Sequence, residues 1–546
     1  MALTLTPMMS SRFLKNIGHH NRFYNRTEPF FVRLADGFGG SLDTVLRKKW
    51  IALAVICVAL AMIIGFGTQL SSELAPIEDR SAVRVALTAP EGTSFEAMDR
   101  NVVAVIDDLI RLVPEREGLI SNTAPGFGGA SAVNSGNIRV MLTDPDERKR
   151  TQMDIAEELA GHFRPFTDAR VIVSQEQSVG GTQRGGLPIQ YVIKAPNLET
   201  LQEVIPRFMD LASHDSVFSA VDVNLKFNKP ELLLSIDREK AAALGVSASA
   251  VAQTLQLAYS GQRYGFFLID DRQYQVIGQI QRSDRSDPSN LKFLHVRNSS
   301  GKLIGLDNLV RVQESARPPQ LYRYDRWVAA TVSANPARGF TIGDGLAEMD
   351  RIAARVLDPS CSTALAGLSK EYAESSSSLI FTFLLALILI YLVLAAQFES
   401  FVDPFIIMLT VPLALAGSLF FLWYFNQTLN IFSQIGQIML IGLVTKTGIL
   451  IVEFANQRRA QGLSALEAAR DATVQRFRPI LMTSLSTILG AMPIALSLGA
   501  GASNRVSMGL AVIGGMLFST AFSLYVVPVL YVLLTGKRTR RIISDR

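Results

Sequence analysis

One stretch of the chain, residues 431–456, has the length of a membrane span and a lysine in its interior. Its sequence, IFSQIGQIMLIGLVTKTGILIVEFAN, is otherwise almost wholly apolar around Lys446. A helix rises about 1.5 Å per residue, so Lys446 lies roughly 15 Å from the polar end at Asn456. That depth is close to the midplane of a hydrocarbon core roughly 30 Å thick. An ammonium there is costly, and such residues are usually paired and often functional.

Two interpretations of Lys446 are open. In the first, Lys446 belongs to the ion relay of a proton-driven transporter, and Glu453 lies two turns further along the same helix face. In the second, its long side chain snorkels to the membrane surface or only fixes helix packing. The relay is the working hypothesis.

The composition indicates a protein that is partly membrane-embedded and partly water-soluble. Of its 546 residues, 49% are hydrophobic and only 18% are charged, with a mean hydropathy of +0.25. That is too apolar for an ordinary soluble protein, although residues 71–377 are polar in composition. Six spans are predicted, at about 50–67, 378–396, 404–424, 431–454, 479–498 and 507–534.

Basic residues set the predicted orientation. They gather in residues 1–49, between the fourth and fifth spans, and in residues 536–546. Six crossings place all three segments on one side, which the positive-inside rule makes cytoplasmic. The large polar region then lies outside a bacterial inner membrane, in the periplasm. We expect residues 1–49 to be an irregular cytoplasmic segment and residues 536–546 a cytoplasmic tail.

The polar region predicts alternating strands and helices, so the fold class is an α+β membrane protein. Strands at 84–88, 137–142 and 170–174, with helices at 94–113 and 153–163, suggest a ferredoxin-like βαβ unit. A second unit begins with a strand at 189–194 and resumes after Tyr322, so the stretch between looks inserted. The predicted domains are residues 50–70, 71–186, 187–224 with 321–377, the insertion 225–320, and the bundle 378–535.

No constellation of an enzyme is present. The five histidines have no metal-ligand spacing with one another or with the cysteines, and no Walker A sequence indicates ATP as the energy source. The net charge of +5 is not a nucleic-acid signal. We therefore expect no catalysis, cofactor, metal or nucleic-acid partner.

The fifth span carries small and hydroxylated residues on one face. Thr483, Thr487 and Gly490 follow helical spacing, and such faces let helices approach closely. Tight packing explains most of them, but Thr483 could meet Lys446 on a neighbouring helix. Arg476, at the predicted cytoplasmic edge, is either a positive-inside anchor or part of the proton passage.

The predicted spans lack a central carboxylate. A proton relay needs a group that changes its protonation near neutral pH, and a midplane carboxylate balanced by a lysine is the usual solution. No Asp or Glu lies near the centre of any span, and Glu453 is near an end. Either another polypeptide supplies the acid, or Lys446 itself titrates.

Five long runs carry a family resemblance. They are LIGLVTKTGILIVEFAN (440–456), RFRPILMTSLSTILGAMPIALSLGAG (476–501), GLAVIGGMLFSTAFSLYVVPVLY (509–531), PELLLSIDREKAAALGVS (230–247) and PIEDRSAVRVALTAPEGTS (76–94). These runs resemble resistance–nodulation–division (RND) efflux pumps, in the branch that expels hydrophobic and amphiphilic drugs. Such pumps have two similar halves, each with six spans and one large outer loop. This chain resembles the C-terminal half.

The resemblance implies roles for particular residues. The paired aspartates of the family lie in the missing N-terminal half, and Lys446, Arg476 and Thr483 match the relay positions opposite them. The loop that separates two drug pockets in the family is matched by Gly126, Phe127 and Gly128.

The resemblance also implies an assembly. The two ferredoxin-like units would be porter subdomains, and the insertion would be a docking domain. Complete pumps form homotrimers with a periplasmic adaptor protein and an outer-membrane channel, and proton antiport drives drug export. The strand at 187–194 has few aromatic residues where family members often have them, so the substrate range is open. Two alternatives are a truncated or split half without transport activity alone, and a metal-exporting relative.

Overall fold

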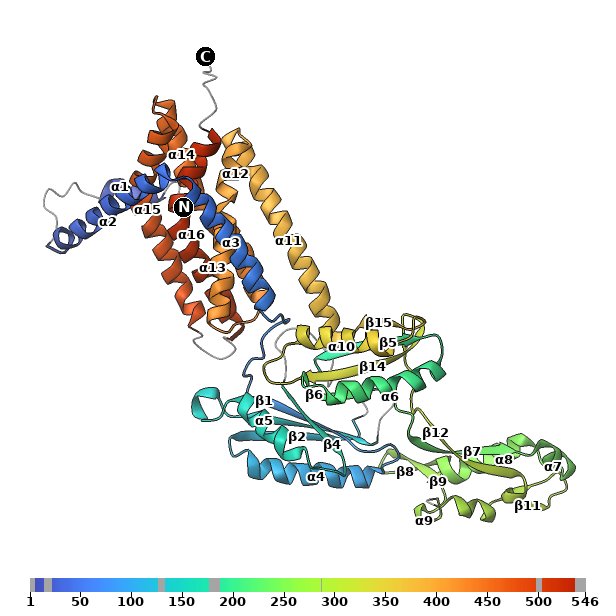
Figure 1. Cartoon of the computed structure of the whole chain (residues 1–546). Helices are drawn as coiled ribbons and strands as arrows, with labels where there is room; N and C mark the ends of the chain where they lie inside the picture. Colours follow the sequence, from blue (N-terminus) through green and yellow to red (C-terminus); the bar gives the residue numbers. More distant parts are fainter. Residues whose placement is uncertain are drawn as a thin grey trace. The chain divides into compact units, whose positions relative to one another are not determined.

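The chain forms two compact units in the computed structural model (Figure 1). The described residues are 5–13, 22–125, 133–175, 187–285, 287–496 and 503–535. The first unit comprises Met1–Thr88, Phe95–Asn224 and Arg323–Arg546, and the second comprises Ala89–Ser94 and Leu225–Tyr322.

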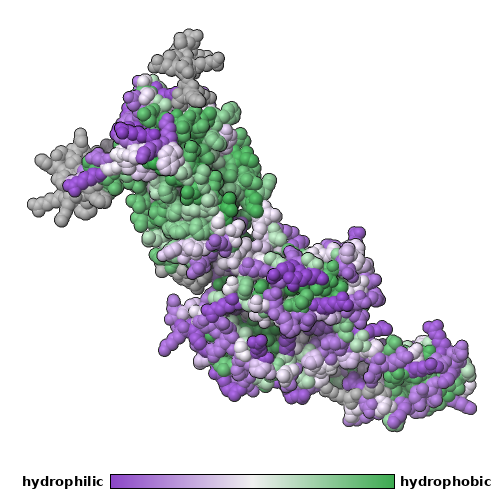
Figure 2. Space-filling view, viewed as in Figure 1, coloured by the Kyte–Doolittle hydropathy of each residue, from purple (hydrophilic) through white to green (hydrophobic). Residues whose placement is uncertain are grey.

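Six helices of the first unit, counted over the described ranges, are long and apolar enough to cross a membrane, which confirms the six predicted spans. They are α3 (Trp50–Gln69), α11 (Gly367–Phe398), α12 and α13 (Val402–Met408 and Thr410–Tyr424, one span), α14 (Ile431–Ala460), α15 (Ala465–Ala495) and α16 (Ser503–Thr535). Helix α16 packs against α13, α14 and α15, whereas α3 and α11 bury few residues. Apolar residues cover the visible face of this bundle (Figure 2).

Helix α11 begins well before the predicted span at residue 378. Its first turns contain the polar run KEYAESSSS, and neither glycine nor proline interrupts the chain between Gly367 and Phe398. A polar sequence without helix breakers continues the apolar helix, so α11 extends in the N-terminal direction beyond the predicted span.

The described residues before α3 are mostly helical, which corrects the prediction of an irregular segment. After the short α1 (Leu5–Phe13), α2 spans Arg22–Arg47. Phe38, Leu42 and Leu46 lie four residues apart on one face and are buried, where α2 contacts α15 and α16. The Phe38 ring stacks on Phe477 with 4.4 Å between centroids. This packing orders a helix that its glycines and Pro29 disfavour locally.

The first α/β portion has the order β1 (Ala82–Thr88), α4 (Phe95–Leu112), β2 (Arg116–Thr123), β3 (Ser135–Leu142), α5 (Gln152–Phe163) and β4 (Arg170–Gln175). Its strands form one antiparallel sheet in the order β2-β3-β1-β4. Val83, Val85 and Leu87 are buried, so alternate residues of β1 pack beneath the helices. The sequence prediction missed β2, because this edge strand is mostly exposed and does not alternate clearly.

The second α/β portion comes from two chain segments. The first contains β5 (Ile189–Ala195), α6 (Leu198–His214) and β6 (Phe218–Val223), and the second contains β13 (Arg323–Tyr324), β14 (Trp327–Pro336), α10 (Ile342–Val356) and β15 (Ser362–Leu365). Strand β14 pairs with β5, β6 and β13, and β15 pairs with the other edge of β5. The short strands β13 and β15 were not predicted.

The second unit contains β7 (Lys229–Ile236), α7 (Arg238–Ala243), α8 (Ala248–Leu255), β8 (Gln262–Ile269), β9 (Arg272–Gly278), α9 (Arg282–Arg285), β10 (His295–Arg297), β11 (Leu303–Gly305) and β12 (Val310–Arg317). Strand β7 pairs with β12, and a small core gathers around Val251, Leu306 and Leu309. The hairpin β8–β9 exposes large apolar side chains, among them Phe266, Leu268 and Ile277.

Candidate functional site

Helix α14 presents Lys446 on a side that the other described helices leave open. The helix starts at a capping box, in which Asn430 accepts a hydrogen bond from the backbone N–H of Ser433 and donates its own N–H to the Ser433 hydroxyl. Thr447 and Gly448 are buried, and a Cβ added at Gly448 would lie 3.1 Å from Ile407. One side of α14 is therefore tightly packed, whereas Lys446 is exposed.

The open face of α14 follows helical spacing through Met439, Gly442, Lys446 and Glu453, all of which are exposed. A Cβ added at Gly442 would meet nothing within 4 Å. Glu453 accepts a hydrogen bond of 3.1 Å from Gln457. Within the described ranges, no hydrogen bond or ion pair joins Lys446 to another residue.

Thr483 lies on the neighbouring helix α15 and is also exposed. Its hydroxyl donates to the carbonyl of Ile480 at 3.1 Å, and its own carbonyl accepts from the Thr487 hydroxyl at 2.9 Å. A Cβ at Gly490 would have nothing within 4 Å. The predicted tight packing of this small-residue face is therefore not made by the described helices of this chain.

Arg476 lies at the contact between α14 and α15. Its Cζ is 4.5 Å from the centroid of the Phe454 ring, which also meets Arg458 at 4.9 Å. Such cation–π contacts contribute about 0.5–2 kcal/mol. The Arg476 Nε is buried and, among the described residues, has no hydrogen-bond acceptor. Arg476 thus contacts Phe454, the residue that follows Glu453 in the sequence.

The three predicted relay residues lie on two adjacent helices, but no hydrogen bond links them in the described part of the chain. Their role in proton transfer stays a prediction. The other predicted site residues, Gly126, Phe127 and Gly128, lie outside the described residues.

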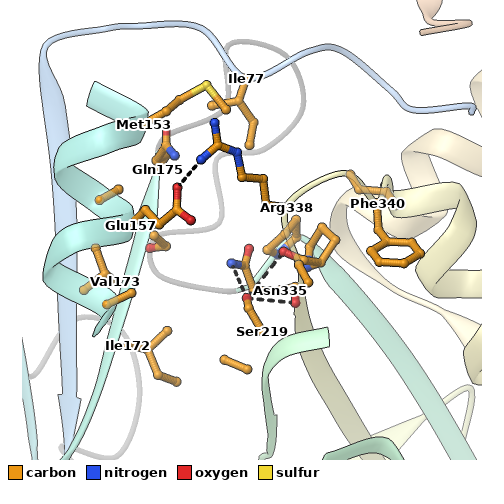
Figure 3. A pocket seen from close by; sticks show the side chains of 18 of the residues that line it. Ile77, Met153, Glu157, Ile172, Val173, Gln175, Ser219, Asn335, Arg338 and Phe340 are labelled. Carbon is orange, nitrogen blue, oxygen red and sulfur yellow. Dashed lines mark hydrogen bonds and ion pairs between the residues drawn. The ribbon is translucent and has the colours of Figure 1, made fainter. Parts of the chain in front are cut away.

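A cleft of about 2780 Å³ opens between the two α/β portions of the first unit (Figure 3). One wall is the face of the first sheet that α4 and α5 leave uncovered, together with the side of α5 that carries Met153 and Glu157. The opposite wall includes Ser219, Asn335 and Phe340 (Figure 3). The lining mixes apolar and polar groups, which suits an amphiphilic ligand. Sequence reasoning missed this cleft because its lining residues are scattered along the chain.

Two arginines connect the walls of the cleft. Arg338 forms an ion pair of 2.7 Å with Glu157 on α5 (Figure 3). Arg170, on β4, donates to the Val221 carbonyl and lies 3.4 Å from the Asp222 carboxylate. The two α/β portions are thus joined by polar contacts at these two places.

A short segment after α3 joins the start of α14 to α10. The Leu429 N–H donates to the Ser71 carbonyl at 2.9 Å, and the Ile431 N–H donates to the Leu74 carbonyl at 3.2 Å. On the other side, the Gly343 N–H donates to the Ser72 carbonyl at 3.2 Å. A Cβ at Gly343 would lie 2.6 Å from that carbonyl oxygen, so the close approach requires glycine.

Glu73, in the same segment, lines the cleft. Burial raises the pKa of Glu73 above its usual value, and the hydrogen bond of 2.5 Å from the Thr428 hydroxyl opposes that rise. The carboxyl group therefore sits where the helical bundle and the cleft meet, with its neutral form favoured relative to water.

Six spanning helices, a cation on an open helix face and a large cleft outside the helices define a membrane protein of the transporter class. The model of the AcrB/AcrD/AcrF family matches residues 1–535, and the chain belongs to this family of RND transporters. A curated relative, an uncharacterized transporter of Haemophilus influenzae, is 30% identical over 539 residues, which are 97% of this chain and 52% of the relative. The chain thus spans about half the length of this curated relative.

Proposed function

We propose that the chain is the C-terminal half of a proton-motive-force-driven exporter of hydrophobic and amphiphilic compounds in a bacterial inner membrane. The observation that carries the proposal is the open face of α14. It holds Lys446 at mid-span with no ion-pair partner among the described residues. A stable bilayer protein does not leave such a charge uncovered. A complementary half that brings carboxylates to Lys446, Arg476 and Thr483 would complete a titrating pair.

The cleft supports a substrate path outside the membrane. Its volume of about 2780 Å³ exceeds that of ordinary drug pockets, and its lining is amphiphilic. We propose that the two α/β portions are ferredoxin-like porter units. Protonation near Lys446 would shift α14, and the cleft would cycle between open and closed states. Drug and proton would move in opposite directions.

The second unit would serve docking. Its hairpin β8–β9 exposes Phe266, Leu268 and Ile277, and large apolar residues on a protruding hairpin favour a protein partner. A homotrimer of complete pumps, with a periplasmic adaptor and an outer-membrane channel, is the assembly that we propose.

The test uses the complete pump, reconstituted from this chain and its complementary half. Lys446→Ala should abolish uncoupler-sensitive efflux of a fluorescent amphiphile while assembly, measured by copurification, is retained. Lys370→Ala, at an exposed position near the start of α11, is the matched control and should transport normally. Normal efflux by the Lys446→Ala pump would refute the relay.

A half without activity of its own is the second candidate, and the same open face favours it. Expressed alone, the chain should then give no drug resistance. Clear resistance from the chain alone would mean that Lys446 or Glu453 suffices for proton coupling.

A further inference from the structure

A chain of hydrogen bonds between side chains joins Glu73 to the start of α14. The Thr428 hydroxyl donates to the Glu73 carboxyl group at 2.5 Å, and the Asn430 amide donates to that hydroxyl at 3.2 Å. Asn430 is fully buried and caps α14, because its side-chain oxygen accepts the Ser433 N–H at 3.0 Å. Glu73 is therefore connected to the N-terminus of the helix that carries Lys446.

The backbone of the same segment holds α10. The Glu73 N–H donates to the Leu429 carbonyl at 3.1 Å, and the carbonyl of the preceding residue, Ser72, accepts the Gly343 N–H of α10 at 3.2 Å. The residue after Gly343 is Asp344. Two carboxyl groups, those of Glu73 and Asp344, thus directly follow the two residues that bond segment 71–74 to α10.

Asp344 is the charged residue of α10 that acts on Glu73, and it repels a negative charge there. It belongs to the capping box of α10, where the Thr341 N–H and hydroxyl donate to its carboxylate at 2.9 and 2.8 Å. These bonds keep the Asp344 carboxylate at the end of the helix that meets the segment. Arg80 and Arg338 line the same cleft as Glu73, but among the described residues no cation forms an ion pair with Glu73.

The other elements around Glu73 contribute hydroxyl groups. On α11, Tyr372 places its hydroxyl 2.8 Å from the position of a Cβ added at Gly343. Burial, the largest effect, and the charge of Asp344 raise the pKa of Glu73 above its usual value, whereas the bond from Thr428 favours the ionised form. The carboxyl group lines the cleft, so water in the cleft can supply its proton or take it up.

We propose that Glu73 is a proton-binding site whose charge controls the contact between segment 71–74 and α10. With the proton bound, the segment is hydrogen-bonded to both α14 and α10. When the carboxyl group releases its proton to water in the cleft, the carboxylates of Glu73 and Asp344 repel each other, and the bond between Ser72 and Gly343 opens. The bond from Thr428 becomes charge-assisted and stronger, so the segment stays with α14 and separates from α10.

The consequence concerns the cleft. Thr341 and Ile342, at the start of α10, line it, so the position of this wall follows the protonation of Glu73. The inference goes beyond the proposed function, because it requires neither Lys446 nor a transported compound.

The experiment measures a distance between α13 and α10 as the pH is raised from about 5 to about 9, a range that lies above the ordinary pKa of a glutamate. The full chain, with Cys57→Ser and Cys361→Ser, is purified in phosphatidylcholine nanodiscs. Spin labels are attached at Tyr424→Cys and Ala347→Cys, because both wild-type residues are exposed. Double electron–electron resonance should give one narrow distance at low pH and a growing longer component at high pH. Infrared pH-difference spectra follow the carbonyl stretch of the protonated carboxyl group and report the titration itself.

Three variants test the assigned roles. Glu73→Gln cannot ionise, so it should lose the infrared band and keep the short distance at every pH. Asp344→Asn retains an oxygen for the cap of α10 but removes the repelling charge, so the band should titrate at lower pH and the longer component should be lost. Thr428→Val removes the donor to the ionised form, so the band should titrate at higher pH, whereas Thr428→Ser should behave as the wild type.

Two controls separate this response from general effects of pH. Glu203→Gln, at an exposed position on α6, should titrate and move as the wild type does. A second label pair, Ala347→Cys with Arg207→Cys, lies on α10 and α6, which pack together in the second α/β portion. Its distance should not change with pH, which excludes unfolding of that portion.

A wild-type distance between α13 and α10 that is independent of pH would overturn the inference. A pH-dependent distance that persists in Glu73→Gln would overturn it too, because another group would then be the one that titrates. Titration of the Glu73 band without a change of distance would refute its control over α10. Each of these results leaves the proposed function untouched, since the measurements involve no transport.

Discussion

Arg338 and Glu157 form an ion pair of 2.7 Å between the two walls of the cleft, with side chains that are 77% and 60% exposed. Surface pairs of this kind contribute only about 0–1 kcal/mol to stability. The pair is therefore suited to bias the opening of the cleft rather than to hold the fold together.

Glu157→Gln should broaden the distribution of distances between the walls without lowering the apparent Tm. The measurement is electron–electron resonance between spin labels at Asp107 on α4 and Arg207 on α6, with Cys57 and Cys361 replaced by serine. Glu158→Gln is a matched control, because Glu158 pairs with Arg150 within the first α/β portion. Equal broadening in both variants would show that the ion pair between Arg338 and Glu157 does not bias the opening of the cleft.

Glu73 should make stability depend on pH. Because burial raises its pKa above the ordinary value of 4.5, the folded state binds the proton more tightly than the unfolded state. Stability attributable to Glu73 is then present below about pH 4.5 and is lost as pH rises through the raised pKa. Glu73→Gln should flatten this slope and raise the apparent Tm at pH 7.5, measured by tryptophan fluorescence. Glu203→Gln, exposed on α6, should leave the profile unchanged, and an unaltered slope in Glu73→Gln would disprove the assignment.

Phe38 should anchor α2. Its side chain is 7% exposed and stacks on Phe477, so Phe38→Ala should cost about 3 kcal/mol and speed trypsin cleavage at Arg33. Leu34→Ala, at a position 41% exposed on the same helix, is the control and should change neither. A Phe38→Ala protein as resistant as the wild type would show that the ion pair between Glu28 and Arg478, at 2.7 Å, suffices to hold α2.

The open face of α14 should become protected when the complementary half is present. In a background with Cys57→Ser and Cys361→Ser, Met439→Cys should react with a membrane-permeant maleimide in the chain alone and resist it after co-expression. Val444→Cys, which is 1% exposed at the wild-type residue, should be unreactive in both samples. Reaction of Met439→Cys at the same rate in both would argue that another surface receives the missing half.

Much of the fold could be predicted, because long apolar runs and alternating strands are local signals. The six spans follow from the long apolar runs, and the mixture of helices and strands follows from the spacing of apolar residues. The errors have a common cause. Strand β2 and helix α2 are ordered by contacts distant in sequence, such as Leu119 beside Val140 and Phe38 on Phe477. Strand β2 has no clear alternation of its own, and the glycines and Pro29 of α2 argue locally against the helix that its apolar spacing favours.

The candidate sites divide in the same way. Lys446 could be identified from the sequence alone, because a charged residue inside a long apolar run is unusual. The ion pair between Arg338 and Glu157 cannot be predicted in this way, because 181 positions separate the two residues and only the fold brings them together. Single-sequence reasoning therefore finds isolated anomalies, whereas contacts between distant residues require the structure.

Backbone hydrogen bonds tie residues 71–74 to the start of α14 on one side and to α10 on the other. A segment that is hydrogen-bonded to both helices transmits a displacement from one to the other, whereas a flexible linker would absorb it. In the proposed transport cycle, a displacement of α14 would therefore be passed on to α10 and to the cleft, and α14 would set the size of the movement there.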